Sequence, residues 1–292
     1  MTLAATAPAL FTIDVEEWYQ PAVMERYVPR NIWAKQPLRL QESLRLLTDA
    51  LDAHGMHATL FCLSSLPREH DALIRNLAEK GHEIASHGHS HRSFSGLSKA
   101  EIKEELISSK KTLEDITGKA VTGFRAPNFS ITDDTIELLI ETGFKYDSSF
   151  FDVKWHPNYG KLQRHPKNNV PYRIHPELIE VPMTVLNWGP LRIPWSGGAY
   201  FRHFPSALFR SGVKHLIRDG YYHFYIHPWE LDTKQPRPEQ MNPISRMRHF
   251  RNISQSQDKL EQLLQSYQFR SIREYLSDPA CLRAVNASFA GE

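Results

Sequence analysis

Short apolar runs alternate with longer amphipathic stretches along most of the chain. The apolar runs are five to nine residues long, are rich in β-branched and aromatic residues, and predict buried strands. The predicted strands are residues 9–15, 57–63, 82–86, 121–125, 178–186 and 221–226. Helical periodicity and start or stop residues predict helices between and after them. The predicted helices are residues 39–54, 67–81, 98–118, 132–143, 205–219 and 254–267.

Regular alternation of this kind is typical of an α/β fold with a parallel sheet or barrel wrapped by helices. We expect a single domain over residues 9–276, with residues 1–8 and 277–292 as terminal extensions. Residues 150–203 are the exception to the alternation, and we expect an irregular excursion there. Its first part, residues 150–176, is rich in Pro, Asn, His and aromatic residues and predicts a surface segment.

Composition excludes several classes of protein. The chain has 292 residues, of which 41% are hydrophobic, and a net charge of +2 with scattered basic residues. Nucleic acid is therefore not an expected partner. The two cysteines, Cys62 and Cys281, are too few for a disulfide framework or a thiolate cluster. No apolar run is long enough for a transmembrane segment, and residues 1–8 lack the basic flank of an export signal. We expect a cytoplasmic protein, with the inner face of the membrane as an alternative.

Charged side chains gather where the predicted strands end. Asp14 and Glu16 close the first strand, and they share one face if the backbone stays extended there. His87, Arg125 and His227 follow later strands. In parallel sheets and barrels the functional residues sit at the carboxyl ends of the strands. These side chains are therefore expected to converge.

His87 and His91 lie four positions apart, so one helical turn would aim both imidazoles at a single point. Two neutral imidazoles and a third ligand from another segment suit a divalent transition metal, most often zinc. A chain with 15 histidines contains about one such pair by accident, so the pair carries weight only together with the strand-end residues.

Taken together, these segments resemble the NodB-homology polysaccharide deacetylases, a large family of carbohydrate esterases. The matching motifs are Thr12-Ile13-Asp14-Val15-Glu16, His87 with His91, Arg125-Ala126-Pro127 and Tyr225-Ile226-His227. They come in the family's order and at strand ends. The Asp-Val-Glu variant, with residues 196–202 and 227–230, resembles more narrowly a bacterial subgroup associated with exopolysaccharide and surface-glycan gene clusters.

The resemblance implies a distorted, incomplete barrel of βα units with C-terminal additions, and metal-dependent removal of N-acetyl groups from amino sugars. His87, His91 and Glu16 are expected to hold the metal, with zinc preferred and cobalt or nickel as alternatives. Asp14 is then free to act as the general base, although it remains an alternative carboxylate ligand. His227 is expected to be the general acid, and Arg125 to pair with Asp14.

Other candidates surround this set. The amide of Asn128 is expected to help hold the oxyanion. Trp18 and Trp195 suit stacking on sugar faces about as well as they suit the core, and Tyr200 and Arg202 are candidates for shaping the cleft. The family often has an Asp before a Trp that tunes the catalytic His. Because Asn187 precedes Trp188 here, Asp147 is the candidate for that role.

The leading hypothesis is an N-deacetylase that acts on an N-acetylated glycan or its lipid-linked or nucleotide-linked precursor. One alternative keeps the fold and changes the reaction to deformylation or the opening of a cyclic amide. The other alternative is a catalytically silent glycan-binding protein, which would more typically have lost Asp14 or His227.

Overall fold

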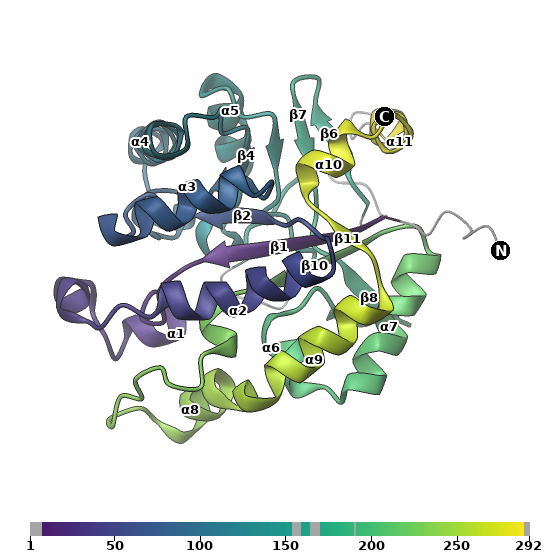
Figure 1. Ribbon diagram of the computed structural model, residues 1–292. Coiled ribbons are helices and arrows are strands. Elements are labelled where there is room, and N and C mark those ends of the chain that lie inside the picture. Colours follow the sequence, from purple (N-terminus) through teal and green to yellow (C-terminus); the bar gives the residue numbers. More distant parts are fainter. Residues whose placement is uncertain (1–7, 154–158, 164–169, 190, 289–292) are drawn as a thin grey trace.

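The computed structural model describes residues 8–153, 159–163, 170–189 and 191–288 (Figure 1). The main sheet contains β1 (Ala9–Val15), β2 (Thr59–Cys62), β3 (Glu83–Ser86), β4 (Gly123–Phe124), β5 (Tyr146–Asp147), β6 (Tyr172–His175), β7 (Leu178–Glu180), β10 (Tyr222–Ile226) and β11 (Phe269–Arg270). A separate hairpin contains β8 (Val185–Trp188) and β9 (Leu191–Pro194). The helices are α1 (Ala22–Glu25), α2 (Leu40–Ala53), α3 (Asp71–Glu79), α4 (Lys99–Thr117), α5 (Asp133–Glu141), α6 (Gly198–His203), α7 (Ser206–Arg218), α8 (Pro243–Phe250), α9 (Ile253–Ser266), α10 (Ile272–Ser277) and α11 (Pro279–Ala287).

The main sheet is a curled, open barrel wall, with helices around it. Its strand order is β10-β1-β2-β3-β4-β5-β7-β6, and β11 also pairs with the start of β1. All pairings are parallel except the one between β6 and β7. Among the described strands β10 and β6 do not pair with each other, so the barrel stays incomplete. This confirms the predicted α/β class and the distorted, incomplete barrel (Figure 1).

Strand β1 lies between β10 and β2, and its side chains are buried on both faces of the sheet. All seven of its residues are buried, and Phe11, Ile13 and Val15 belong to the main hydrophobic core. Parallel strands that are buried on both faces of a sheet have nearly continuous apolar sequences, and the sequence of β1 is of this kind. The polar Asp14 lies near the carboxyl end of this run, where burying a carboxylate is costly unless it is paired.

Local sequence signals fixed most helix ends where they were expected. Helix α4 begins with a capping box in which the Ser98 hydroxyl and the Glu101 carboxylate each bind the other's backbone N–H, and it ends at Gly118 with φ +65°. Thr132 caps α5. The predicted helix over 67–81 is a short 3-10 turn followed by α3.

The predicted irregular excursion over residues 150–203 is wrong in its described parts. Residues 172–203 contain β6, β7, the β8–β9 hairpin and α6, and the predicted strand over 178–186 is split between β7 and β8. The aromatic side chains of Phe150 and Phe151 are buried rather than on the surface. Aromatic residues bury large areas without periodic spacing, so the polar and Pro-rich composition concealed this packing.

Residues after 276 continue the packed structure. Helix α11 packs against α10 and β6, its Val285 is fully buried, and the carbonyl of Ser288 accepts a hydrogen bond from Arg173. The predicted domain end at residue 276 therefore falls within α10. None of the described helices has the length and apolar character that crossing a bilayer requires.

Candidate active site

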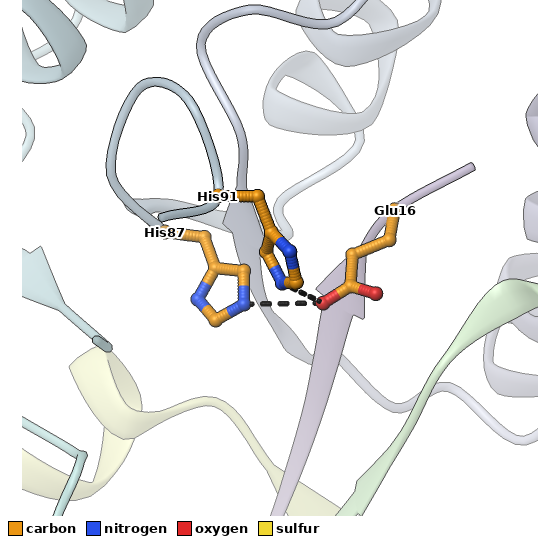
Figure 2. Close-up of side chains that lie close together, drawn as sticks. All are labelled: Glu16, His87 and His91. Atoms are coloured by element: carbon orange, nitrogen blue, oxygen red, sulfur yellow. Dashed lines mark hydrogen bonds and ion pairs between the residues drawn. The ribbon is translucent and has the colours of Figure 1, made fainter. Parts of the chain in front are cut away.

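Three buried side chains from two strand ends meet at one point. The Nε2 atoms of His87 and His91 lie 3.2 and 3.0 Å from the same oxygen of Glu16, Oε1 (Figure 2). One ligand atom from each of the three residues lies within 4.8 Å of the others. Glu16 follows β1, and both histidines follow β3. The extended backbone places Asp14 and Glu16 on the site side. Glu17 faces away and accepts hydrogen bonds from the backbone N–H groups of Arg39 and Leu40 at the start of α2.

We predicted that the two histidines lie on one helical turn, and this prediction is wrong. They lie in a loop in which Gly88 has φ +80° and His91 has φ +58°. Here Glu105 of α4, buried to 4% exposure, organises the loop by accepting hydrogen bonds from the backbone N–H groups of His89 and Ser90. On the other side, Arg30 donates to the carbonyls of Ser90 and His91. The loop is held by these side chains instead of by helical hydrogen bonds.

Asp14 is paired with a fully buried arginine. Its Oδ1 accepts a hydrogen bond from Arg125 Nη1 at 2.6 Å. The remaining donors of Arg125 go to Thr12, Ser148 and His223, so its guanidinium has one fixed orientation. The backbone of Arg125 also serves the cluster, because its carbonyl lies 2.8 Å from Nδ1 of His87. That hydrogen bond leaves Nε2 of His87 free to face Glu16.

His227 follows β10 and faces both acidic residues. Its Nε2 lies 3.9 Å from Asp14 Oδ2 and 3.9 Å from Glu16 Oε1. Its Nδ1 lies 2.8 Å from Glu230, whose other oxygen accepts a hydrogen bond from Arg202 at 2.7 Å. Both Glu230 and Arg202 are buried. A buried ion pair therefore orients the imidazole.

The charges of these groups shift their pKa values in opposite directions. Burial alone would raise the pKa of Glu16, but the imidazoles of His91, His227 and His87 outweigh it and hold that pKa well below its usual value. Burial opposes charging His227, yet the carboxylates of Glu16, Glu230 and Asp14 raise its pKa to about 9. The imidazole is therefore a cation at neutral pH.

An open cavity of about 360 Å³ gives access to this cluster. Asp14, Glu16, His87, His91 and His227 line it. It is also lined by Asn128, whose backbone has φ +55° and whose N–H none of the described hydrogen bonds uses. Aromatic walls are provided by Phe129, Tyr159, Tyr225 and Trp229.

Several predicted substrate residues lie elsewhere. Trp18 and Trp195 are buried in the core, and their indole N–H groups donate to the carbonyls of Pro37 and Phe209. Stacking on a sugar therefore does not fit either of them. Arg202 is also buried and does not line the cavity, and Tyr200 is half-buried beside it.

Asp147 is not the partner of His227. It is the last residue of β5, accepts a hydrogen bond from the Ser149 hydroxyl and interacts with Glu180. Burial raises the pKa of Asp147, which also argues against a charged partner for a histidine. The carboxylate at His227 is that of Glu230. The sequence contains a signal for this partner, the spacing of His227 and Glu230 in His-Pro-Trp-Glu. This spacing places Glu230 in the first turn of a 3-10 helix (Pro228–Leu231) that begins after His227.

Comparison with known proteins matches the two halves of the chain to two family models. Residues 36–146 match the polysaccharide deacetylase family, and residues 148–277 match a domain of unknown function, DUF3473. A peptidoglycan deacetylase of Helicobacter pylori is 35% identical over 89 residues, which is 30% of this chain and 30% of that protein. Residues 36–146 belong to a polysaccharide deacetylase domain. The alignments with the first curated relatives cover only about a quarter to a third of their lengths.

Solved structures place the polysaccharide deacetylase domain in a wider fold group. A pseudoenzyme of carbohydrate esterase family 4 from Bacillus anthracis aligns over 94% of this chain and 66% of its own, with 15% identity and a TM-score of 0.51. Puue allantoinase aligns over 93% and 90%, with 16% identity and a TM-score of 0.60. At these identities the likeness concerns the fold alone. The chemistry is therefore inferred from the side chains of the site and not from the fold.

Proposed function

We propose that this chain is a metal-dependent hydrolase that removes N-acetyl groups from the amino sugars of a bacterial glycan or of its lipid-linked or nucleotide-linked precursor. One observation carries the proposal. A His-His-Glu cluster, an arginine-paired aspartate and a carboxylate-oriented histidine line the same cavity. Together they match the needs of metal-assisted amide hydrolysis, which are carbonyl polarisation, a base for the water and an acid for the leaving nitrogen.

The cluster suits a divalent cation. Glu16 Oε2 is buried and has no hydrogen-bond partner among the described residues, and three ligand atoms gather around one point. Two imidazoles and one carboxylate form the ligand set of hydrolytic zinc sites that keep a position open. Zinc is therefore the expected metal, with cobalt and nickel as alternatives. A metal bound there polarises the acetamide carbonyl and the attacking water.

Asp14 is the proposed general base. Arg125 donates a hydrogen bond to its carboxylate and so holds it in one orientation next to the cluster. As the water oxygen forms its bond to the acetyl carbon, Asp14 accepts the water's proton. Asn128 lines the same cavity, and its N–H is proposed to donate to the oxyanion.

His227 is the proposed general acid. In its cationic form both ring nitrogens carry a proton: Nδ1 donates its proton to Glu230, and the proton on Nε2 is the one available to the substrate. When the C–N bond breaks, this proton goes to the leaving nitrogen, and the products are acetate and the free amino sugar. The acetic acid carries the second proton of the water and loses it to the amino group or to solvent, so it leaves as acetate. The proton on Asp14 then returns to His227 through solvent, which restores both residues.

The decisive experiment measures product release by the metal-loaded protein from N-acetylchitotetraose. Acetate should be released by the wild type, and Asp14→Asn should retain the metal but release none. The control is Asp115→Asn, an exposed position on α4, which should behave as the wild type. Formate from an N-formyl analogue without acetate release would favour a deformylase instead. Retained binding without any release would favour a silent glycan-binding protein.

A further inference from the structure

A positive side chain lies at the same cavity and is not used by the proposed chemistry. Arg248 of α8 lines the cavity together with Asp14, Glu16 and His227. Its side chain is exposed, and no ion pair joins it to a carboxylate of the described residues. The acidic residues of the site have partners of their own, since Asp14 binds Arg125 and Glu16 faces the two histidines. The charge of Arg248 is therefore left for a ligand.

The chain holds Arg248 at a fixed place relative to His227. Arg202 donates hydrogen bonds to the backbone carbonyls of Arg248, His249 and Arg251, at 3.2, 2.9 and 2.9 Å. Its Nε binds Glu230, and Glu230 binds His227. One buried guanidinium thus ties the end of α8 to the residue that orients the imidazole. The position of Arg248 does not depend on a mobile surface loop.

Two tyrosines lie near Arg248, and one of them, Tyr159, is part of the cavity wall. Burial raises the pKa of Tyr159 and that of Tyr200, while the positive charge of Arg248 opposes the rise in both. The three side chains are therefore close enough to interact electrostatically. Aromatic side chains pack on sugar faces, and a guanidinium binds carboxylate or phosphate oxygens in a bidentate manner.

We propose that the N-acetylated glycan carries an anionic group, a sugar carboxylate or a sugar phosphate, and that Arg248 binds it. This inference rests on the proposed function, because it names the class of substrate for the same cavity. The group lies close enough to the acetamide for both to occupy one cavity of about 360 Å³. Arg248 then selects the substrate without taking part in the proton transfers.

The test uses matched pairs of probes that differ in charge. N-acetylchitotetraose is compared with a hyaluronan tetrasaccharide, which carries carboxylates, and N-acetylglucosamine with its 1-phosphate. Binding is measured by calorimetry to the metal-loaded protein in an Asp14→Asn background, and acetate release is measured with Asp14 intact. The variants are Arg248→Gln and, as a matched control, Arg251→Gln, which removes an exposed charge that does not line the cavity.

We expect Arg248→Gln to lower the affinity for a charged probe about 10-fold more than the affinity for its neutral partner. A loss of this size is typical when one charge-assisted hydrogen bond is removed. Arg251→Gln should not change this ratio. The pair that responds identifies the anion as carboxylate or phosphate. Equal losses for charged and neutral probes, equal effects of the two variants, or a wild type that favours neither charged probe would overturn the inference. Acetate release in that case still supports the proposed function, whereas Arg248-dependent binding without acetate release contradicts the function alone.

Discussion

Glu230 holds the imidazole of His227 through a hydrogen bond of 2.8 Å between its Oε1 and Nδ1 of the ring. The two residues lie three positions apart, and the backbone N–H of His227 also donates to Glu230. The short 3-10 helix (Pro228–Leu231) brings the carboxylate back onto the ring. Because Nδ1 is engaged there, Nε2 faces the cavity side, where Asp14 and Glu16 lie.

This pair predicts a specific change in pH dependence. The carboxylate of Glu230 contributes to raising the pKa of His227 to about 9, and a general acid works only while it is protonated. In Glu230→Gln the pKa of His227 should fall, so the alkaline limb of kcat/KM should move to lower pH. The profile should be measured from pH 5 to 10.

The pH at which the alkaline limb of kcat/KM falls does not depend on the fraction of folded protein. It therefore distinguishes a lowered pKa of His227 from a loss of stability. That separation matters because Glu230→Gln also leaves the buried Arg202 without its ion-pair partner. Glu239→Gln, at an exposed position, is the control and should leave the limb in place. An unchanged limb in Glu230→Gln would mean that His227 is not the titrating acid.

Adjacent glutamates should separate metal binding from stability. Glu16→Gln should lower the metal content measured after dialysis, because Glu16 faces both histidines. Glu17→Gln should keep the metal but lower the free energy of unfolding by about 1 kcal/mol, since Glu17 caps the start of α2. Metal content and denaturant unfolding of both variants check this. Equal loss of metal in both variants would contradict the assignment of Glu16.

The strand-end residues could be predicted from the sequence because a strand has a period of two. That period placed Asp14 and Glu16 on one side and Glu17 on the other, and the parallel order brought β1, β3 and β10 to the same edge. The fold followed from the same regular alternation. These features depend on local periodicity and on one topological rule.

Features that depend on distant partners could not be predicted in this way. The sequence favours neither a core nor a surface position for Trp18 and Trp195. Their burial becomes evident only in the structure, where their indole N–H groups donate to the carbonyls of Pro37 and Phe209. The segment with His87 and His91 is a loop and not the expected helical turn, and Glu105 of α4 accepts hydrogen bonds from the N–H groups of His89 and Ser90. Composition alone does not reveal such pairings.

Glu105 is predicted to position the metal ligands without touching the metal. Glu105→Ala leaves the N–H groups of His89 and Ser90 without their acceptor, so metal affinity should fall about 10- to 100-fold. Glu105→Gln keeps an acceptor oxygen and should restore most of the affinity. Glu104→Ala, at an exposed position on the same helix, should have no effect. Affinity measured by competition with a chelator checks the series, and equal losses in Glu105→Ala and Glu104→Ala would refute it.

The last prediction separates the general acid from a residue that only positions the substrate. His227→Ala should retain the metal, because His227 lies 3.9 Å from Glu16 and the cluster is complete without it. Its loss in kcat/KM should be large for amides with a basic leaving amine and smaller for those with a weakly basic one, since these need less protonation. The measurement is kcat/KM for a series of N-acetyl substrates with graded leaving amines, compared between the wild type and His227→Ala. His215→Ala, on the exposed face of α7, is the control and should follow the wild type throughout. A constant loss across the series would show that His227 positions the substrate and that the proton comes from another group.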